Sequence, residues 1–201
     1  MTDFRWGALL WSAAFLARLL SGLGSAIFGT DGCHYLLMAD WMRAGRWHDA
    51  LMVAYHPMYP LLISAARTVI GGTEAAGEWV SILLASAATI PLFLTVKSVF
   101  GRPTAVFTSL LYAFYPRVVE VQADVMTEGT FMFFLFGTMW LTFRMMEEPR
   151  LDRAAVLGAT AAAAFLTRVE GLLAVALAIG WPLLEAIRQR DGRIRRVGAV
   201  L

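Results

Sequence analysis

The sequence contains very little cysteine and little charge. Its single cysteine excludes an internal disulfide framework and a multi-cysteine metal site. Charged residues make up 16% of the 201 residues and hydrophobic residues 59%. Soluble globular domains carry about 25% charged and about 45–50% apolar residues. The motifs HExxH, DxD and the Walker loop are also absent. The composition therefore argues against a soluble enzyme, and the mean hydropathy of +0.63 indicates a membrane protein.

Charge-free windows predict an all-α polytopic membrane bundle, since one span needs about 20 residues. The N-terminal stretch is interpreted as an uncleaved anchor, because it is long, is interrupted by Arg18 and is followed by more spans. A seventh span is predicted to begin at Val197, and residues 1–201 form one transmembrane module. The six predicted spans lie at about 6–28, 78–100, 102–117, 128–145, 153–168 and 170–187.

The distribution of basic residues predicts the orientation in the membrane. With the N-terminus in the cytoplasm, eleven of the 17 Lys and Arg residues fall on inside segments and five on outside segments. The net charge of +2 follows this topology, so it does not indicate a nucleic-acid partner. The predicted location is a bacterial inner membrane, crossed several times, with the lipid bilayer as surroundings and the N-terminus in the cytoplasm.

This orientation creates a long first outside loop, about 29–77, that is too apolar to be a free loop. We predict two amphipathic helices lying at the membrane interface, at 31–45 and 56–72. Pro57 and Pro60 fall near the first turn of the second helix, where proline is tolerated. The alternative for the second helix is a full span at 57–71.

Polar residues collect at the predicted outer surface. Carboxylates together with Arg and His suit the binding of a phosphorylated lipid head group and the deprotonation of a hydroxyl. The three outside segments hold, in order, Asp31, His34, Asp40, His48, Asp49 and His56; then Arg117, Glu120, Asp124 and Glu128; then Arg168 and Glu170.

Each of these residues also has a simpler interpretation. Asp31 could cap the 32–45 helix, and Glu128 could complement a helix dipole. Arg168 and Glu170 could form a local salt bridge between helix ends. The three histidines could be ordinary interfacial or loop side chains. Arg18 lies within a span, where an unpaired charge is costly, so it needs a partner that the sequence does not identify.

A divalent metal ion is one hypothesis for the acidic residues. Asp124 and Glu128 are four positions apart, which would place them on one helix face. An ion between these two and Asp31 would have oxygen ligands. No spacing typical of a metal site supports it, so the metal requirement stays open.

The order of four segments resembles the N-terminal membrane module of the GT-C glycosyltransferases. The likeness is closest to the family 39-like branch, which includes protein O-mannosyltransferases and lipid A aminoarabinose transferases. The segments are DGCHYLLMADWMRAGRW (31–47), HPMYPLLISAARTVIGG (56–72), FGRPTAVFTSLLYAFYP (100–116) followed by MTEGTFMFFLF (126–136), and AFLTRVEGLL (164–173).

The resemblance implies a reaction and a role for each matching position. The reaction is inverting transfer of a sugar from a polyprenyl-phosphate donor to an acceptor hydroxyl on the outer side of the membrane. Asp31 would be the catalytic base, and Glu128 a second acidic residue that assists in the site or with a metal. His56 and Arg168 would approach the lipid phosphate. Tyr35, Asp124 and Glu170 complete the expected substrate-binding set.

Two departures from the family pattern stand out. Gly32 follows Asp31 where relatives commonly have an acidic pair, and His56 replaces a more usual Lys. Because family members run to several hundred residues, we expect this chain to be the N-terminal part of a longer protein. Two alternatives to an enzyme remain. One is a non-catalytic or degenerate membrane subunit, and the other is a transporter or flippase component for lipid-linked sugars, which Arg18 would support.

Overall fold

The structure is a computed structural model that describes residues 2–23 and 29–198, apart from the side chains of 186 and 189–198. Within these residues the chain forms eleven α-helices and one short 3-10 helix and no strand, so the predicted all-α class is confirmed. The helices are α1 (Asp3–Gly22), α2 (Thr30–Arg43), α3 (Trp47–Leu51), α4 (Met58–Ile70), α5 (Thr73–Ala87), α6 (Thr89–Phe100), α7 (Arg102–Phe114), α8 (Pro116–Ala123), α9 (Glu128–Glu147), α10 (Leu151–Thr167), η1 (Val169–Gly171) and α11 (Leu172–Gly198).

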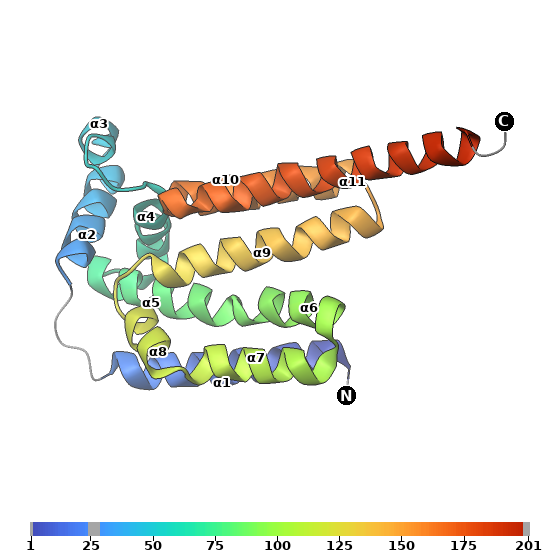
Figure 1. Cartoon of the computed structure of the whole chain (residues 1–201). Helices are drawn as coiled ribbons and strands as arrows, with labels where there is room; N and C mark the ends of the chain where they lie inside the picture. The colour runs from blue at the N-terminus through green and yellow to red at the C-terminus, as the bar shows by residue number, and fades with distance from the viewer. Residues whose placement is uncertain (1, 24–28, 199–201) are drawn as a thin grey trace.

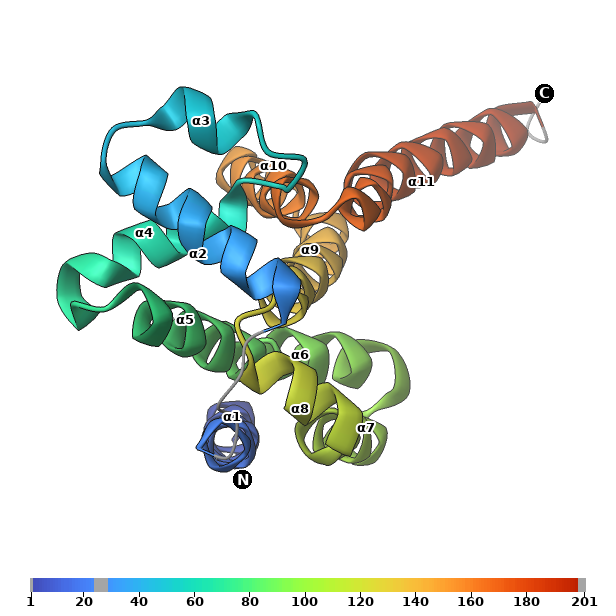
Figure 2. The same cartoon turned by 90° about the vertical axis from the view of Figure 1, so that its left-hand side faces the viewer.

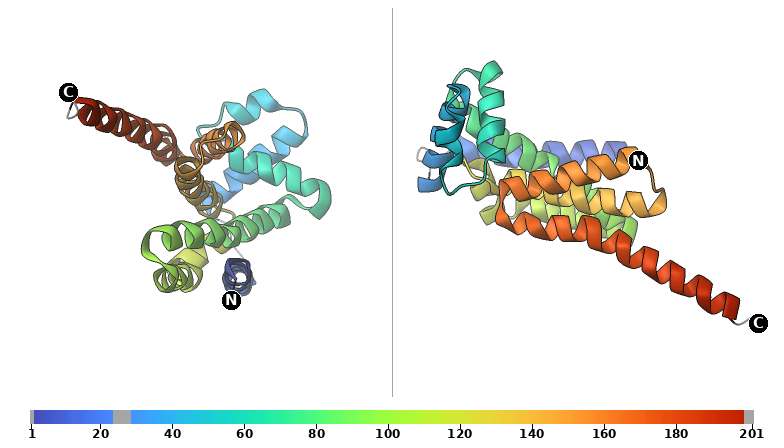
Figure 3. Two further views of the ribbon diagram at one scale, coloured as in Figure 1. Left: turned by 90° about the vertical axis from the view of Figure 1, so that its right-hand side faces the viewer. Right: turned by 90° about the horizontal axis from the view of Figure 1, so that it is seen from above.

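The long helices lie side by side, and the short ones gather at one end. Helices α1, α5–α6, α7, α9 and α10 run roughly along one direction, and α11 extends beyond them (Figure 1). Helices α2, α3, α4 and α8 lie at the end opposite the N-terminus (Figure 1). The view from above shows the same division (Figure 3). The chain therefore has a bundle with a cap of short helices.

Helices α5 and α6 together form the most apolar segment. They are interrupted near Ala88 because Pro91, three residues further on, has no N–H to donate to the carbonyl of Ala87. In the described part of the chain, the 28-residue segment Thr73–Phe100 that they form is the one helical segment long and apolar enough to cross a membrane by itself. The six-span topology therefore stays a prediction.

Helix α4 matches the second predicted helix of the first loop. Its 13 residues extend about 20 Å at 1.5 Å per residue, less than the roughly 30 Å hydrocarbon core. Pro57 is the N-cap and Gly71, with φ of 87°, is the C-cap. Helix α7, at the third predicted span, has the same 13 residues, so length does not decide between the interface and a full span, and the position of α4 at the interface stays a prediction.

The observed helices differ from the predicted elements in three places. The third ends at Phe114 rather than 117, because Pro116 holds Tyr115 in extended backbone and starts α8. Helix α3 was not predicted either. Helix α11 continues to Gly198 without a turn, so no break separates the sixth span from the predicted start of the seventh at Val197. Residues 199–201 of that seventh span, and 24–28 of the first, lie outside the described residues.

Arg18 finds its partner on α8. Its side chain is completely buried, and its Nη2 and Nε donate to Gln122 Oε1 at 2.6 and 3.1 Å. Its Nη1 donates to the Ala14 carbonyl at 3.0 Å, and the guanidinium lies 4.9 Å from the centre of the Tyr112 ring. Arg18 therefore joins α1, α7 and α8, which lie next to one another in the end-on view (Figure 2).

Candidate active site

A cavity of about 220 Å³ lies under the cap of short helices, where four segments distant in sequence meet. They are the start of α2, the loop between α3 and α4, the residues before α9 and the turn after α10. Five of the seven predicted site residues line it, Glu128 contacts one of those five, and Asp124 does not line it. The lining residues are Asp31, Tyr35, Ala54, Tyr55, His56, Thr127, Thr167, Arg168, Val169 and Glu170.

The turn between α10 and α11 presents Arg168 to this cavity. Helix α10 ends at Thr167, and Arg168 has an extended backbone. Gly171 then packs directly on the end of α10. A Cβ there would lie 2.3 Å from the Ala164 carbonyl carbon and the Phe165 nitrogen. The turn therefore needs glycine, which explains the LTRVEG pattern in the sequence.

Arg168 binds two carboxylates at once. Its Nη1 lies 2.8 Å from Glu128 Oε1 and 3.1 Å from Thr127 Oγ1. Its Nη2 and Nε lie 3.1 and 3.3 Å from the two carboxylate oxygens of Glu170. The hydrogen bonds from Arg168 lower the pKa of Glu170, and those to Glu170 raise the pKa of Arg168. The predicted salt bridge is present, and an incoming anion must compete with these carboxylates.

Glu128 has a buried carboxylate oxygen without a partner in the described part of the chain, which an interaction with the helix dipole alone does not explain. It lies in the first turn of α9, as the simpler interpretation expected. Its Oε2, however, is buried, and no described residue forms a hydrogen bond with it. Buried polar atoms in proteins nearly always have a partner. Glu128 therefore offers one free acceptor atom beside the cavity.

Asp31 is held by a tyrosine rather than used as a helix cap. Helix α2 begins at Thr30 with Gly29 as the N-cap, and no side chain caps it, so the cap interpretation is wrong. Asp31 Oδ1 instead accepts a hydrogen bond of 2.8 Å from the hydroxyl of Tyr55. That hydrogen bond raises the pKa of Tyr55. The Asp31 carboxylate is exposed and at the same time fixed in direction.

Aromatic rings form the rest of the wall. The Tyr55 ring stacks on His34 at 5.2 Å and meets the edge of Tyr35 at 5.2 Å. Burial raises the pKa of Tyr35, so its phenol stays protonated. His56 is half-buried, with its ring edge-on to Phe165 at 5.7 Å. A protonated phenol and an imidazole therefore face the same small space as Asp31 and Arg168.

Comparison with known proteins bears on this arrangement. A family model described as dolichyl-phosphate-mannose-protein mannosyltransferase matches residues 54–200, which is most of the chain. The chain belongs to this family. The resemblance to GT-C glycosyltransferases is thereby confirmed. No curated protein and no solved structure matches the chain.

The mannosyltransferase match covers His56, Glu128 and Arg168 but begins after Asp31. The family is one of membrane glycosyltransferases, which agrees with the composition and with the apolar helix Thr73–Phe100. The place of Asp31 in the site therefore depends on the geometry, in which it lines the same cavity as Arg168.

The fold does not bring Asp124 to the cavity. Asp124 is the C-cap of α8, and its Oδ1 accepts a hydrogen bond of 2.7 Å from the Val125 N–H. The expectation that it shares a helix face with Glu128 is wrong, because Glu128 begins the next helix, α9. No three His, Cys, Asp or Glu side chains of the described residues gather to hold a metal ion. The residues present do not fit the metal hypothesis.

Sequence reasoning missed three polar residues that lie at this cavity, Tyr55, Thr127 and Thr167. Tyr55 lies in an irregular loop, directly before His56, and only the fold brings it to Asp31. Thr127 and Thr167 precede Glu128 and Arg168 and line the cavity beside them. Their adjacency to predicted site residues was the one signal that could have identified them.

Proposed function

We propose that this chain forms the donor-side part of an inverting membrane glycosyltransferase. The donor is a sugar linked to a polyprenyl phosphate, and the acceptor is a hydroxyl on the outer side of the membrane. The observation that carries the proposal is that Asp31 and Arg168, distant in sequence, line one cavity. One is a carboxylate able to accept a proton, and the other is a cation able to bind a phosphate.

Asp31 acts as the general base in this proposal. It takes the proton of the acceptor hydroxyl as the oxygen attacks the anomeric carbon. The hydrogen bond from Tyr55 engages Oδ1 and keeps the carboxylate from rotating, so Oδ2 is the oxygen that takes the proton. The bond between the anomeric carbon and the phosphate oxygen breaks in the same step, so the configuration inverts and no covalent sugar–enzyme intermediate forms.

Arg168 stabilises the departing lipid phosphate. A fixed guanidinium binds phosphate through two parallel N–H groups, and it stabilises charge that develops on the leaving group. The two N–H groups that would do so are those now bound to Glu170. The side chain of Glu170 is 49% exposed and that of Glu128 31%, so Glu170 is the carboxylate that the phosphate displaces. His56 and Tyr35 bind the donor from the facing wall.

The topology is part of the same proposal. Six spans, with α2 and α4 at the interface, place the cavity at the outer surface and the N-terminus in the cytoplasm. Residues 1–201 would form the N-terminal module of a longer enzyme. The transporter alternative loses its support, since Arg18 is occupied in packing α1 against α8.

The test uses the complete protein reconstituted in vesicles with polyprenyl-phosphate mannose, the donor class that the family description names. We expect sugar to pass to an acceptor hydroxyl with inversion of the anomeric centre, as measured by NMR of the product. A product with retained configuration would contradict the single-displacement reaction. Absence of transfer from a panel of lipid-linked sugars would favour the non-catalytic alternative.

A further inference from the structure

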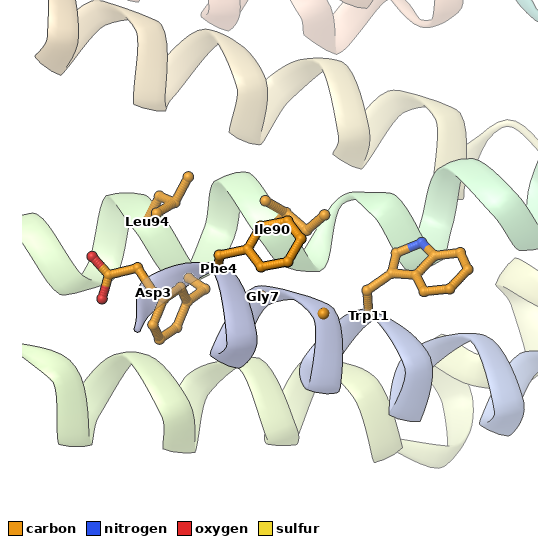
Figure 4. A pocket seen from close by; sticks show the side chains of 8 residues that line it. Asp3, Phe4, Gly7, Trp11, Ile90 and Leu94 are labelled. Atoms are coloured by element: carbon orange, nitrogen blue, oxygen red, sulfur yellow. The ribbon is translucent and has the colours of Figure 1, made fainter. Parts of the chain in front are cut away.

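A second cavity, larger than the first, lies at the other end of the bundle. It has a volume of about 470 Å³ and runs between α1 and α6 (Figure 4). Its walls are Phe4, Gly7, Ala8 and Trp11 of α1 with Ile90, Phe93 and Leu94 of α6. Asp3 is the one charged residue in its lining. The proposed reaction uses none of these residues.

The shape of this groove suits a hydrocarbon chain. Its floor is Gly7, where an added Cβ would meet no atom within 4 Å. Figure 4 shows Asp3 at one end of the groove and Trp11 at the other. The eight steps along the helix from Asp3 to Trp11 amount to about 12 Å. An apolar groove of this length can hold part of one extended acyl chain.

The groove opens on the outside of the bundle. Helix α1 lies at the edge of the bundle in both end-on views (Figures 2 and 3). Phe4 is 84% exposed and Ile90 38%. In a membrane protein such surfaces face lipid, so the channel can be entered from the bilayer without opening the bundle.

Charge at one end of the groove indicates the type of lipid. Asp3 receives hydrogen bonds from Lys97 and, at 3.2 Å, from Arg102. The pKa of Asp3 is lowered, mainly by the hydrogen bond from Lys97, so Asp3 is ionised. One carboxylate with two cations leaves a net charge of +1, which one phosphodiester anion would neutralise. The Lys97 and Arg102 side chains are 31% and 47% exposed and therefore accessible.

We propose that the α1–α6 groove is a binding site for one anionic glycerophospholipid. One acyl chain lies over Gly7 between Phe4 and Trp11, and the phosphate contacts Lys97 and Arg102. This site is separate from the proposed sugar-transfer site and does not depend on that function. In the proposed topology the site faces the cytoplasmic leaflet. The anionic lipids of that leaflet attract Lys and Arg side chains close to the membrane surface.

The first test measures lipid retention by native mass spectrometry of the complete protein in detergent. Phosphatidylglycerol and phosphatidylcholine with identical chains are the probes. We expect one retained phosphatidylglycerol, lost in Gly7→Leu, whose side chain fills the groove. Gly158→Leu is the matched control, because a Cβ at this exposed glycine also meets nothing within 4 Å. Equal retention by the two variants would overturn the proposal.

A second variant tests the headgroup. Arg102→Gln leaves the Asp3–Lys97 pair with no net charge. We expect the preference for phosphatidylglycerol over phosphatidylcholine to fall by about fivefold, the factor expected for one basic residue near anionic lipid. We expect this variant still to retain one lipid, because the acyl-chain groove is unchanged. An unchanged preference would mean that the charges do not contact the lipid.

A photo-crosslink identifies the occupant in native membranes. A benzophenone amino acid replaces Phe4, and the mass of the adduct is measured. A phospholipid adduct supports the site. An adduct with a polyprenyl phosphate, or with another segment of the complete protein, would overturn it.

Discussion

The buried Arg18–Gln122 pair allows one quantitative prediction. Gln122→Leu keeps the approximate size of the side chain but removes the oxygen that accepts from Arg18 Nη2 and Nε at 2.6 and 3.1 Å. Both side chains are buried, at 0% and 3% exposed, so water cannot replace the lost acceptor easily. A hydrogen bond to a charged group contributes about 1.5–3 kcal/mol, and an unpaired buried charge costs more than a neutral group. We therefore expect a loss of about 3 kcal/mol in the free energy of unfolding.

The assay is thermal unfolding of the purified protein in a fixed detergent. For a chain of this size, 1 kcal/mol corresponds to about 2–4 °C, so the midpoint should fall by about 6–12 °C. Gln122→Glu, which keeps an acceptor, should lose much less. The double variant Arg18→Leu/Gln122→Leu should be more stable than the sum of the single effects predicts. A Gln122→Leu midpoint within about 2 °C of the unchanged protein would refute this account, since that shift corresponds to at most 1 kcal/mol.

Three further predictions concern the site. Tyr55→Phe should lower kcat for sugar transfer by about tenfold or more, the value of one hydrogen bond to a charged group, with KM for the donor unchanged. A comparable rise in KM with kcat unchanged would mean that Tyr55 binds the donor instead. Glu170→Gln should lower KM for the lipid-linked donor at constant kcat, because Arg168 no longer has to release a carboxylate; a raised KM would show that Glu170 orients Arg168 for binding. Gly171→Ala should reduce the unfolding midpoint and activity together, whereas Gly180→Ala, where a Cβ meets nothing within 4 Å, should change neither.

The sequence predicted the long helices because their apolar character is a local property. Helices α9 and α10 begin and end within two residues of the predicted spans. Helices α3 and α8 escaped prediction because they are short and polar. At Tyr115 the following residue, Pro116, is the local signal of the break. Apolar windows alone do not show where a proline redirects the chain.

The site was predicted as a set of residues but not as a set of contacts. The resemblance brought Asp31 and Arg168 together, and the fold places them in one cavity. The ion pair between Arg168 and Glu128 joins residues far apart in sequence, and so does the bond between Tyr55 and Asp31. Pairings of this kind depend on how helices pack, and no local pattern encodes them. Asp124 was misplaced because one continuous helix was assumed where two meet.

The central claim is that Asp31 accepts the proton of the acceptor hydroxyl while other residues hold the donor. The most direct measurement is the single-turnover rate of Asp31→Asn in the complete protein with the lipid-linked donor already bound. General-base catalysis contributes about 10²–10⁴ in rate, so the account predicts a loss of at least about 100-fold with donor Kd within about twofold. Asp49→Asn, another acidic residue of the same region paired with Arg46, is the control and should react normally. A normal single-turnover rate in Asp31→Asn would contradict the assignment.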